Sequence, residues 1–102
     1  MLSNELANAI RTELQYDINF IKWTQFRRTN SYLGDFYTVN VGGKDYQILP
    51  YRSYNTVVAF TYKDGFYEVG KYSRTTSKQV TQIYNEFYAS SPFCRYFVPR
   101  TR

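Results

Sequence analysis

The chain has no histidine and a single cysteine, Cys94, among its 102 residues. One cysteine excludes a disulfide within the chain, and without an imidazole to activate it we do not expect Cys94 to be a nucleophile. Zinc sites and Ser-His or Cys-His catalysis within one chain are excluded for the same reason. The composition therefore predicts a protein that is not an enzyme and needs no cofactor or metal.

Long apolar runs are also missing from the sequence. No stretch approaches the roughly 18 residues of a membrane span. Residues 1–9 lack the basic start and apolar centre of a secretory signal. We therefore expect a single cytoplasmic domain over residues 1–102, with no membrane partner.

Aromatic and basic residues are abundant instead. Twelve Tyr, eight Phe and one Trp exceed what a core of this size requires, so many tyrosines should be half exposed, ready for interface contacts or base stacking. The alternative is a coding bias toward Tyr and Phe without functional meaning. A net charge of +5 favours acidic partners such as nucleic acid or a nucleoprotein complex.

Two segments have the apolar spacing of a helix. Ser3 is an N-cap candidate, and the four-residue recurrence of Leu6, Ile10, Leu14 and Ile18 predicts a helix from Asn4 to Ile18. Residues 20–26 fit either a strand or a continued helix, and we favour a helix that continues to Phe26.

The second helix is predicted near the C-terminus. Thr76 and Gln79 form a capping box, so this helix should begin near Ser77. Its apolar stripe comprises Val80, Ile83, Tyr84, Phe87 and Tyr88.

Four strands are predicted between the helices. Phe36 to Val41 and Lys44 to Leu49 flank Gly42-Gly43, a link that suits a tight hairpin, and Pro50 should end the second strand.

After a turn over residues 51–55, the apolar run Thr56 to Tyr62 should be a central strand. Asp64-Gly65 would turn the chain into Phe66 to Val69. Phe93 to Val98 could add an edge strand or fold back over the second helix.

The order of these elements predicts an α+β fold. It is a two-layer sandwich with an N-terminal helix, a four-stranded antiparallel sheet and a C-terminal helix. Both helices would cover one sheet face, and the other face would carry exposed aromatic residues. The candidates for an aromatic interface are Tyr37, Tyr46, Tyr54 and Tyr67.

The junction before the second helix is the strongest chemical signal. Arg74 and Lys78 flank a helix start, whose free N–H groups favour an anion. Together with Arg52 and Lys71 they would contact phosphate, with hydroxyls from Thr75, Thr76 and Ser77. The alternative is that the hydroxyls only cap the helix.

A resemblance to other proteins adds to this interpretation of the residues. The segments Ser53 to Ala59 and Lys71 to Gln79 resemble a pattern in small uncharacterised proteins from phages and plasmids of low-GC Gram-positive bacteria. The resemblance implies an origin on a mobile element and no catalytic residues. It also implies an inhibitor of a host defence complex in the bacterial cell, anti-CRISPR proteins included, with a CRISPR effector and its guide RNA as the partner.

Three functions remain open from the residues. The first is a non-enzymatic binding protein for nucleic acid or a nucleoprotein complex. The second is a structural protein that self-associates, for example as a homodimer through Phe93 to Val98. The third is a RelE-like ribonuclease in which Lys, Arg and Tyr replace histidine.

Overall fold

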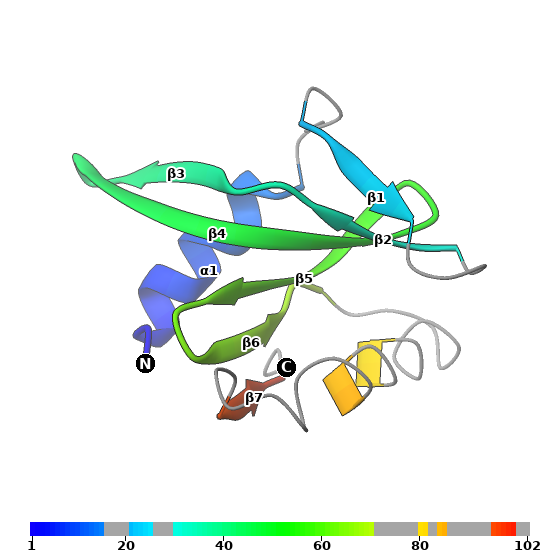
Figure 1. Cartoon of the computed structure of the whole chain (residues 1–102). Helices are drawn as coiled ribbons and strands as arrows, with labels where there is room; N and C mark the ends of the chain where they lie inside the picture. The colour runs from blue at the N-terminus through cyan, green and yellow to red at the C-terminus, as the bar shows by residue number, and fades with distance from the viewer. Residues whose placement is uncertain (16–20, 26–29, 71–79, 82–83, 86–94, 100–102) are drawn as a thin grey trace.

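The computed structural model describes residues 1–15, 21–25, 30–70, 80–81, 84–85 and 95–99. Within these residues an N-terminal helix, α1 (Asn4–Glu13), is followed by a seven-stranded mixed sheet (Figure 1). The strands are β1 (Trp23–Gln25), β2 (Ser31–Gly34), β3 (Tyr37–Val41), β4 (Lys44–Ser53), β5 (Thr56–Tyr62), β6 (Gly65–Glu68) and β7 (Tyr96–Val98).

The sheet order is β1-β2-β4-β5-β6-β7, and β3 pairs with β4 off this path. All pairs are antiparallel except β6 and β7, which are parallel. The predicted four-stranded antiparallel sheet with a C-terminal helix is therefore wrong. The prediction lacked β1 and β2 and left β7 as one of two alternatives, because β2 and β7 pair with strands far away in the sequence and β1 pairs with β2.

The helix α1 starts where the sequence predicted and ends earlier. The Ser3 hydroxyl accepts a hydrogen bond of 3.2 Å from the Leu6 N–H, as an N-cap does. The helix ends at Glu13, and Ile18 lies outside the described residues. The helix favoured for residues 20–26 is wrong, since Trp23–Gln25 forms β1 and pairs with β2.

The hairpin of β3 and β4 is confirmed. Gly42 and Gly43 have φ angles of 61° and 83°, which glycine adopts without steric cost. Val39 pairs with Tyr46 in the ladder.

Pro50 does not end β4, contrary to the prediction. The strand pairs with β3 up to Ile48 and with β2 from Tyr51, so Pro50 lies at the step between these two neighbours. We infer that a residue without an N–H is tolerated at this step because one side of the strand has no partner there.

The strand β5 has the predicted bounds and lies between β4 and β6. The turn before it is shorter than predicted, because residues 51–53 belong to β4 and only Tyr54 and Asn55 form the turn. The following turn consists of Lys63 and Asp64, and Gly65 already belongs to β6.

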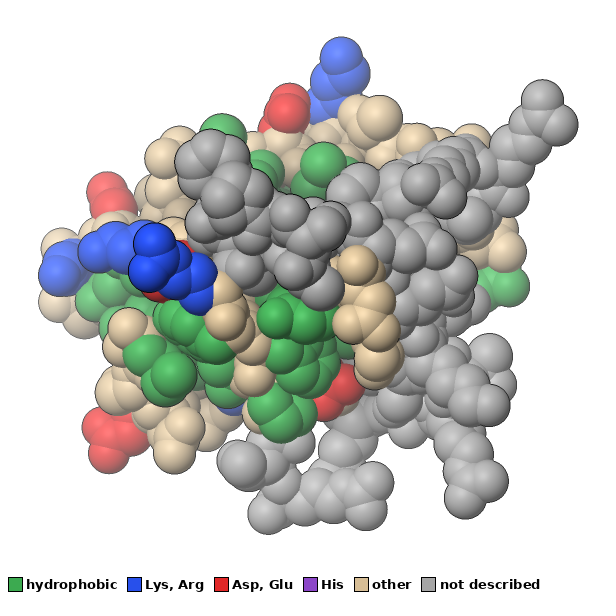
Figure 2. All heavy atoms as spheres, turned by 60° about the horizontal axis from the view of Figure 1, so that its bottom comes forward, with side chains coloured by type: hydrophobic (Ala, Val, Ile, Leu, Met, Phe, Trp, Pro, Cys, Tyr) green, Lys and Arg blue, Asp and Glu red, His purple; other side chains and the backbone are tan. Residues whose placement is uncertain are grey.

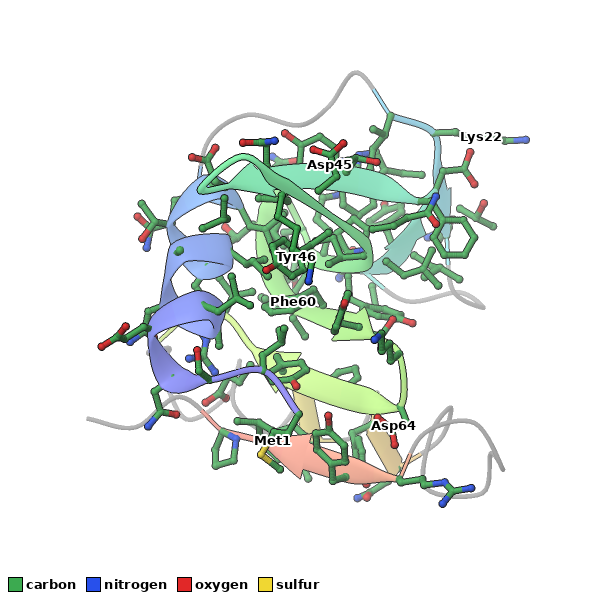
Figure 3. The ribbon with its side chains drawn as sticks, turned by 90° about the vertical axis from the view of Figure 1, so that its left-hand side faces the viewer. Met1, Lys22, Asp45, Tyr46, Phe60 and Asp64 are labelled. Carbon is green, nitrogen blue, oxygen red and sulfur yellow. The ribbon has the colours of Figure 1, made fainter. Side chains whose placement is uncertain are left out.

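Both faces of the sheet are covered by apolar side chains. The helix-side cluster joins residues of α1 to Tyr46, Ile48, Phe60 and Tyr67 (Figure 3). The second cluster, on the other face, contains Tyr51, Val58, Ala59, Phe66 and Val80. Phe66 and Tyr67 are neighbours in β6, so their side chains point to opposite faces.

The described residues of the predicted second helix therefore pack on the face opposite α1. Val80, Thr81, Tyr84 and Asn85 have helical backbone, and Val80 is fully buried in the second cluster. Ile83, Phe87 and Tyr88 lie outside the described residues. The prediction of both helices on one face is wrong, because β5 and β6 carry apolar residues on both faces and each face needs a cover.

A chain of hydroxyls connects the N-terminus to β6 and β7. The Leu2 N–H donates to the Tyr67 hydroxyl at 2.9 Å, and the hydroxyls of Tyr67 and Tyr96 lie 3.0 Å apart. Burial raises the pKa of Tyr96 well above its ordinary value, and hydrogen bonding with Tyr67 and the nearby Asp64 carboxylate adds to this increase. The Tyr96 hydroxyl therefore stays protonated in the folded protein.

We expect the Phe60→Ala variant to lower the free energy of unfolding by about 3–5 kcal/mol, the usual cost of removing a buried aromatic ring. Phe60 is fully buried and stacks on Tyr67 with ring centroids 5.0 Å apart. The matched control is Phe36→Ala, because Phe36 is 62% exposed and its loss should change stability by less than about 0.5 kcal/mol. Urea unfolding measures both, and equal effects would contradict the placement of Phe60.

We expect the stability of the parent to fall as the pH rises above 10.0, the ordinary pKa of Tyr96. The unfolded chain releases the Tyr96 proton there while the folded chain keeps it, so alkaline pH favours unfolding. The Tyr96→Phe variant should lose stability less steeply between pH 9 and 11, roughly the range in which tyrosines titrate. Urea unfolding of the parent and the variant across this range tests the difference, and equal slopes would contradict it.

Candidate functional site

Most of the predicted phosphate-binding residues lie outside the described residues. These residues are Lys71, Arg74, Thr75, Thr76, Ser77 and Lys78. Cys94, which we do not expect to be a nucleophile, also lies outside the described residues. The prediction of an anion site before the second helix therefore stays a prediction. Arg52 is the described member of the predicted set, and it has a well-defined environment.

Arg52 lies between two aromatic rings at one end of the sheet. Its guanidinium carbon is 4.6 Å from the centre of the Trp23 ring and 4.3 Å from the centre of the Tyr32 ring. Three strands bring these residues together, because Tyr32 of β2 pairs with Arg52 of β4 and β1 pairs with the other edge of β2. We call Trp23, Tyr32 and Arg52 the stacked-arginine cluster.

All three residues of the stacked-arginine cluster are half-buried. A guanidinium that stacks on rings keeps its N–H groups in its own plane, where they form a fixed fork that suits phosphate. The rings thus orient the charge, and the cluster is partly exposed, although the Arg52 Nε atom is itself buried. This arrangement can bind an anion without a large loss of side-chain entropy on binding.

Gly34 makes room for Trp23 in this cluster. A Cβ atom at Gly34 would lie 2.9 Å from both Ile21 Cδ1 and Pro50 Cγ, and 3.0 Å from Trp23 Cζ3. The Trp23 indole N–H is buried and has no hydrogen-bond partner among the described residues. Packing and the guanidinium therefore hold the ring in place.

The four predicted interface tyrosines have very different exposures. Tyr67 is fully buried and Tyr46 is 9% exposed, both on the side of α1, so neither presents a ring to a partner. Tyr37 is half-buried against the same cluster. Tyr54 is 60% exposed. The predicted open aromatic sheet face is wrong because α1 covers these rings.

Tyr54 lies at the same end of the sheet as the stacked-arginine cluster. Its N–H donates to the Asn30 carbonyl at 2.7 Å, directly before β2, and Ser31 pairs with Ser53. The described residues at this end, in the ranges 23–25, 30–33 and 51–57, include no Asp or Glu. The local charge at this end is therefore positive among the described residues.

Trp23 and Tyr32 were missed as site residues by sequence reasoning. The alternation of Ile21 and Trp23 with polar residues was a strand signal, but the helical spacing from Ile18 competed with it. Favouring the helix separated Trp23 from Arg52. No local signal in the sequence pairs β2 with β4.

Other kinds of site find little support in the described part of the chain. It contains no group of three or more His, Cys, Asp or Glu side chains that could hold a metal ion. No helix within it is long and apolar enough to cross a membrane.

Comparisons with known proteins give one finding. No curated protein and no solved structure matches the chain. A family model described as a family of unknown function, DUF8033, matches residues 22–96, which include all of the strands except the last two residues of β7. The chain belongs to this family, DUF8033.

Proposed function

We propose that the protein is a non-enzymatic binding protein for single-stranded nucleic acid. The observation that carries the proposal is the Arg52 guanidinium held between the rings of Trp23 and Tyr32. Arg52 would contact phosphate, and the exposed ring of Tyr54 would stack on an unpaired base.

Charge supports a nucleic acid as the partner. The chain has 13 Lys and Arg against 8 Asp and Glu, and a positive protein attracts a polyanion over long distances. Single strands fit better than a duplex because flat rings bind unpaired bases by stacking, with little dependence on sequence. A short, half-buried cluster also offers no helix to enter a major groove.

Two broader ideas from the sequence stay predictions. One is the origin on a phage or plasmid, with inhibition of a CRISPR effector or another host nucleoprotein complex. Such complexes contain single-stranded RNA or DNA, so this role is compatible with the proposed binding. The other comprises two alternatives, self-association and a RelE-like ribonuclease, and no specific observation in the described residues favours either.

The first test is the Tyr54→Ser variant in fluorescence anisotropy with a labelled single strand. We expect its affinity to fall by about 1–3 kcal/mol, the usual value of one stacked base. Phe36→Ser is the matched control, because Phe36 is 62% exposed, close to the 60% of Tyr54, and lies after the opposite end of β2. The control should bind as the parent does.

The same titration separates phosphate contact from other binding. We expect the affinity of the parent to fall as the salt concentration rises. Lys and Arg side chains that bind phosphates release counterions from the strand, and this release becomes less favourable at high salt. Arg52→Lys keeps the charge and loses the planar fork, so it should weaken binding with little change in the salt slope. If the parent does not bind the labelled strand at about 50 mM salt, where phosphate contacts are strong, the proposal is wrong.

A further inference from the structure

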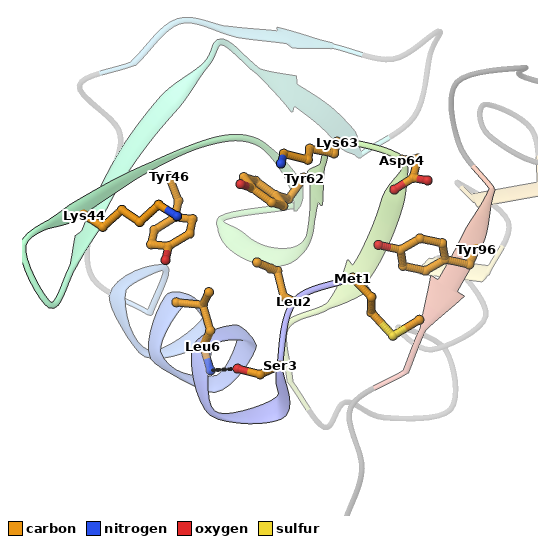
Figure 4. A pocket seen from close by; sticks show the side chains of 10 residues that line it. All are labelled: Met1, Leu2, Ser3, Leu6, Lys44, Tyr46, Tyr62, Lys63, Asp64 and Tyr96. Atoms are coloured by element: carbon orange, nitrogen blue, oxygen red, sulfur yellow. Dashed lines mark hydrogen bonds between the residues drawn. The ribbon is translucent and has the colours of Figure 1, made fainter.

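A pocket of about 360 Å³ lies at a different place from the stacked-arginine cluster. It is bordered by the start of α1, the first residues of β4, the turn between β5 and β6, and Tyr96 of β7 (Figure 4). Met1, Tyr46 and Asp64 lie away from Lys22, which projects from the far end of the molecule (Figure 3). The volume is within the usual range for small-molecule sites.

Two lysines reach this pocket, Lys44 from the start of β4 and Lys63 from the turn between β5 and β6. Lys44 Nζ lies 5.5 Å from the centre of the Tyr46 ring, and Lys63 Nζ lies 5.4 Å from the centre of the Tyr62 ring. The two rings meet edge to face with centroids 5.8 Å apart. Figure 4 shows the two amines extending toward each other over the rings, and Figure 2 shows Lys and Arg side chains beside hydrophobic ones on one face of the molecule.

Lys63 has an unusual backbone conformation. Its φ angle is 52°, in the left-handed region that glycine and asparagine favour. A lysine there is strained, and strained backbone is often found at functional sites. The strained position places a cation at the mouth of the pocket.

The wall formed by the turn between β5 and β6 and by β7 carries a hydrogen-bond acceptor. Asp64 and Tyr96 face each other there (Figure 4). Asp64 is the single acidic residue among those that line the pocket. A ligand that fits therefore has an anionic group for the lysines and an N–H donor for Asp64.

We propose that this pocket binds a nucleoside monophosphate. Lys44 and Lys63 bind the phosphate, the half-buried Tyr62 ring supports the base, and Asp64 accepts a hydrogen bond from an amino group on the base. The same chemistry is present in a free nucleotide and in the terminal nucleotide of a strand. This site does not depend on the proposed function, because it shares no residue with the stacked-arginine cluster.

The test is isothermal titration with AMP, GMP, CMP and UMP, with inorganic phosphate and adenosine as partial ligands. We expect saturable binding of at least one nucleotide bearing a base amino group, and at least tenfold weaker binding of both partial ligands, since about 1.4 kcal/mol separates tenfold affinities. Binding of inorganic phosphate as tight as that of the nucleotides would overturn the proposal. The proposal would also be overturned if no mononucleotide saturated the protein at concentrations up to about 5 mM, which is above the dissociation constant of a weak, millimolar site.

Variants locate the site. Lys63→Gly removes the amine and relieves the left-handed strain, so it should keep the melting temperature and weaken nucleotide binding by about tenfold, as loss of one charged hydrogen bond does. Lys22→Ser removes an exposed lysine elsewhere and should bind as the parent does. Equal binding by Lys63→Gly and the parent would overturn the proposal.

A further arm identifies the source of the nucleotide. If the pocket accepts the end of a strand, a 5′-phosphorylated trinucleotide competes with AMP for it. Competition that is lost in the Lys63→Gly variant but kept in the Tyr54→Ser variant supports binding in the pocket. Competition lost in Tyr54→Ser but kept in Lys63→Gly would assign the phosphate contact to the other surface and overturn the proposal. Failure to bind free mononucleotides leaves binding of long strands at the stacked-arginine cluster unaffected, so the two proposals fail separately.

Discussion

The strand β4 is the constraint on which the rest of the sheet depends. It pairs with β3 through residues 44–48 and with β2 through residues 51–53, while β5 pairs along residues 49–53. One strand must therefore keep register with three neighbours. A slip by one residue would turn Tyr46 and Ile48 away from α1 and Tyr51 away from the second cluster, so burial on both faces fixes the register.

An irregularity in β5 completes this two-sided burial. Tyr51 pairs with Ala59 and Arg52 with Val57, which leaves Val58 as an extra residue in β5. Val58 and Ala59 both join the second cluster, as the two residues of a bulge can, while Phe60 joins the helix-side cluster. With both faces occupied here, the exposed aromatic and basic groups among the described residues lie mainly at the ends of the strands, where both candidate surfaces lie.

Local signals in the sequence predicted local structure and failed for distant contacts. The Ser3 cap, the Gly42-Gly43 turn and the apolar run of β5 act within a few residues, and they were predicted. Arg11 shows the opposite case, because it lies off the apolar stripe of Leu6, Ile10 and Leu14. It is 4% exposed, and its Nε donates to the Glu68 carbonyl at 2.6 Å. The pairing of Trp23 and Tyr32 with Arg52 likewise depends on strand partners that no short segment specifies.

The two candidate surfaces use cations and rings in different ways. Arg52 is packed between two rings, so it serves the fold as well as any ligand, whereas Lys44 and Lys63 are exposed and each approaches one ring. An exposed cation–ring contact contributes about 0.5–1 kcal/mol, so a ligand can recruit these lysines at little cost.

Tyr54 and Lys63, with φ angles of 53° and 52°, are the non-glycine residues of positive φ in the described chain. They begin the turns at the two ends of β5, one beside each surface, and glycine would relieve the strain at both. A substitution by glycine at either position therefore removes a side chain of one candidate surface without adding backbone strain.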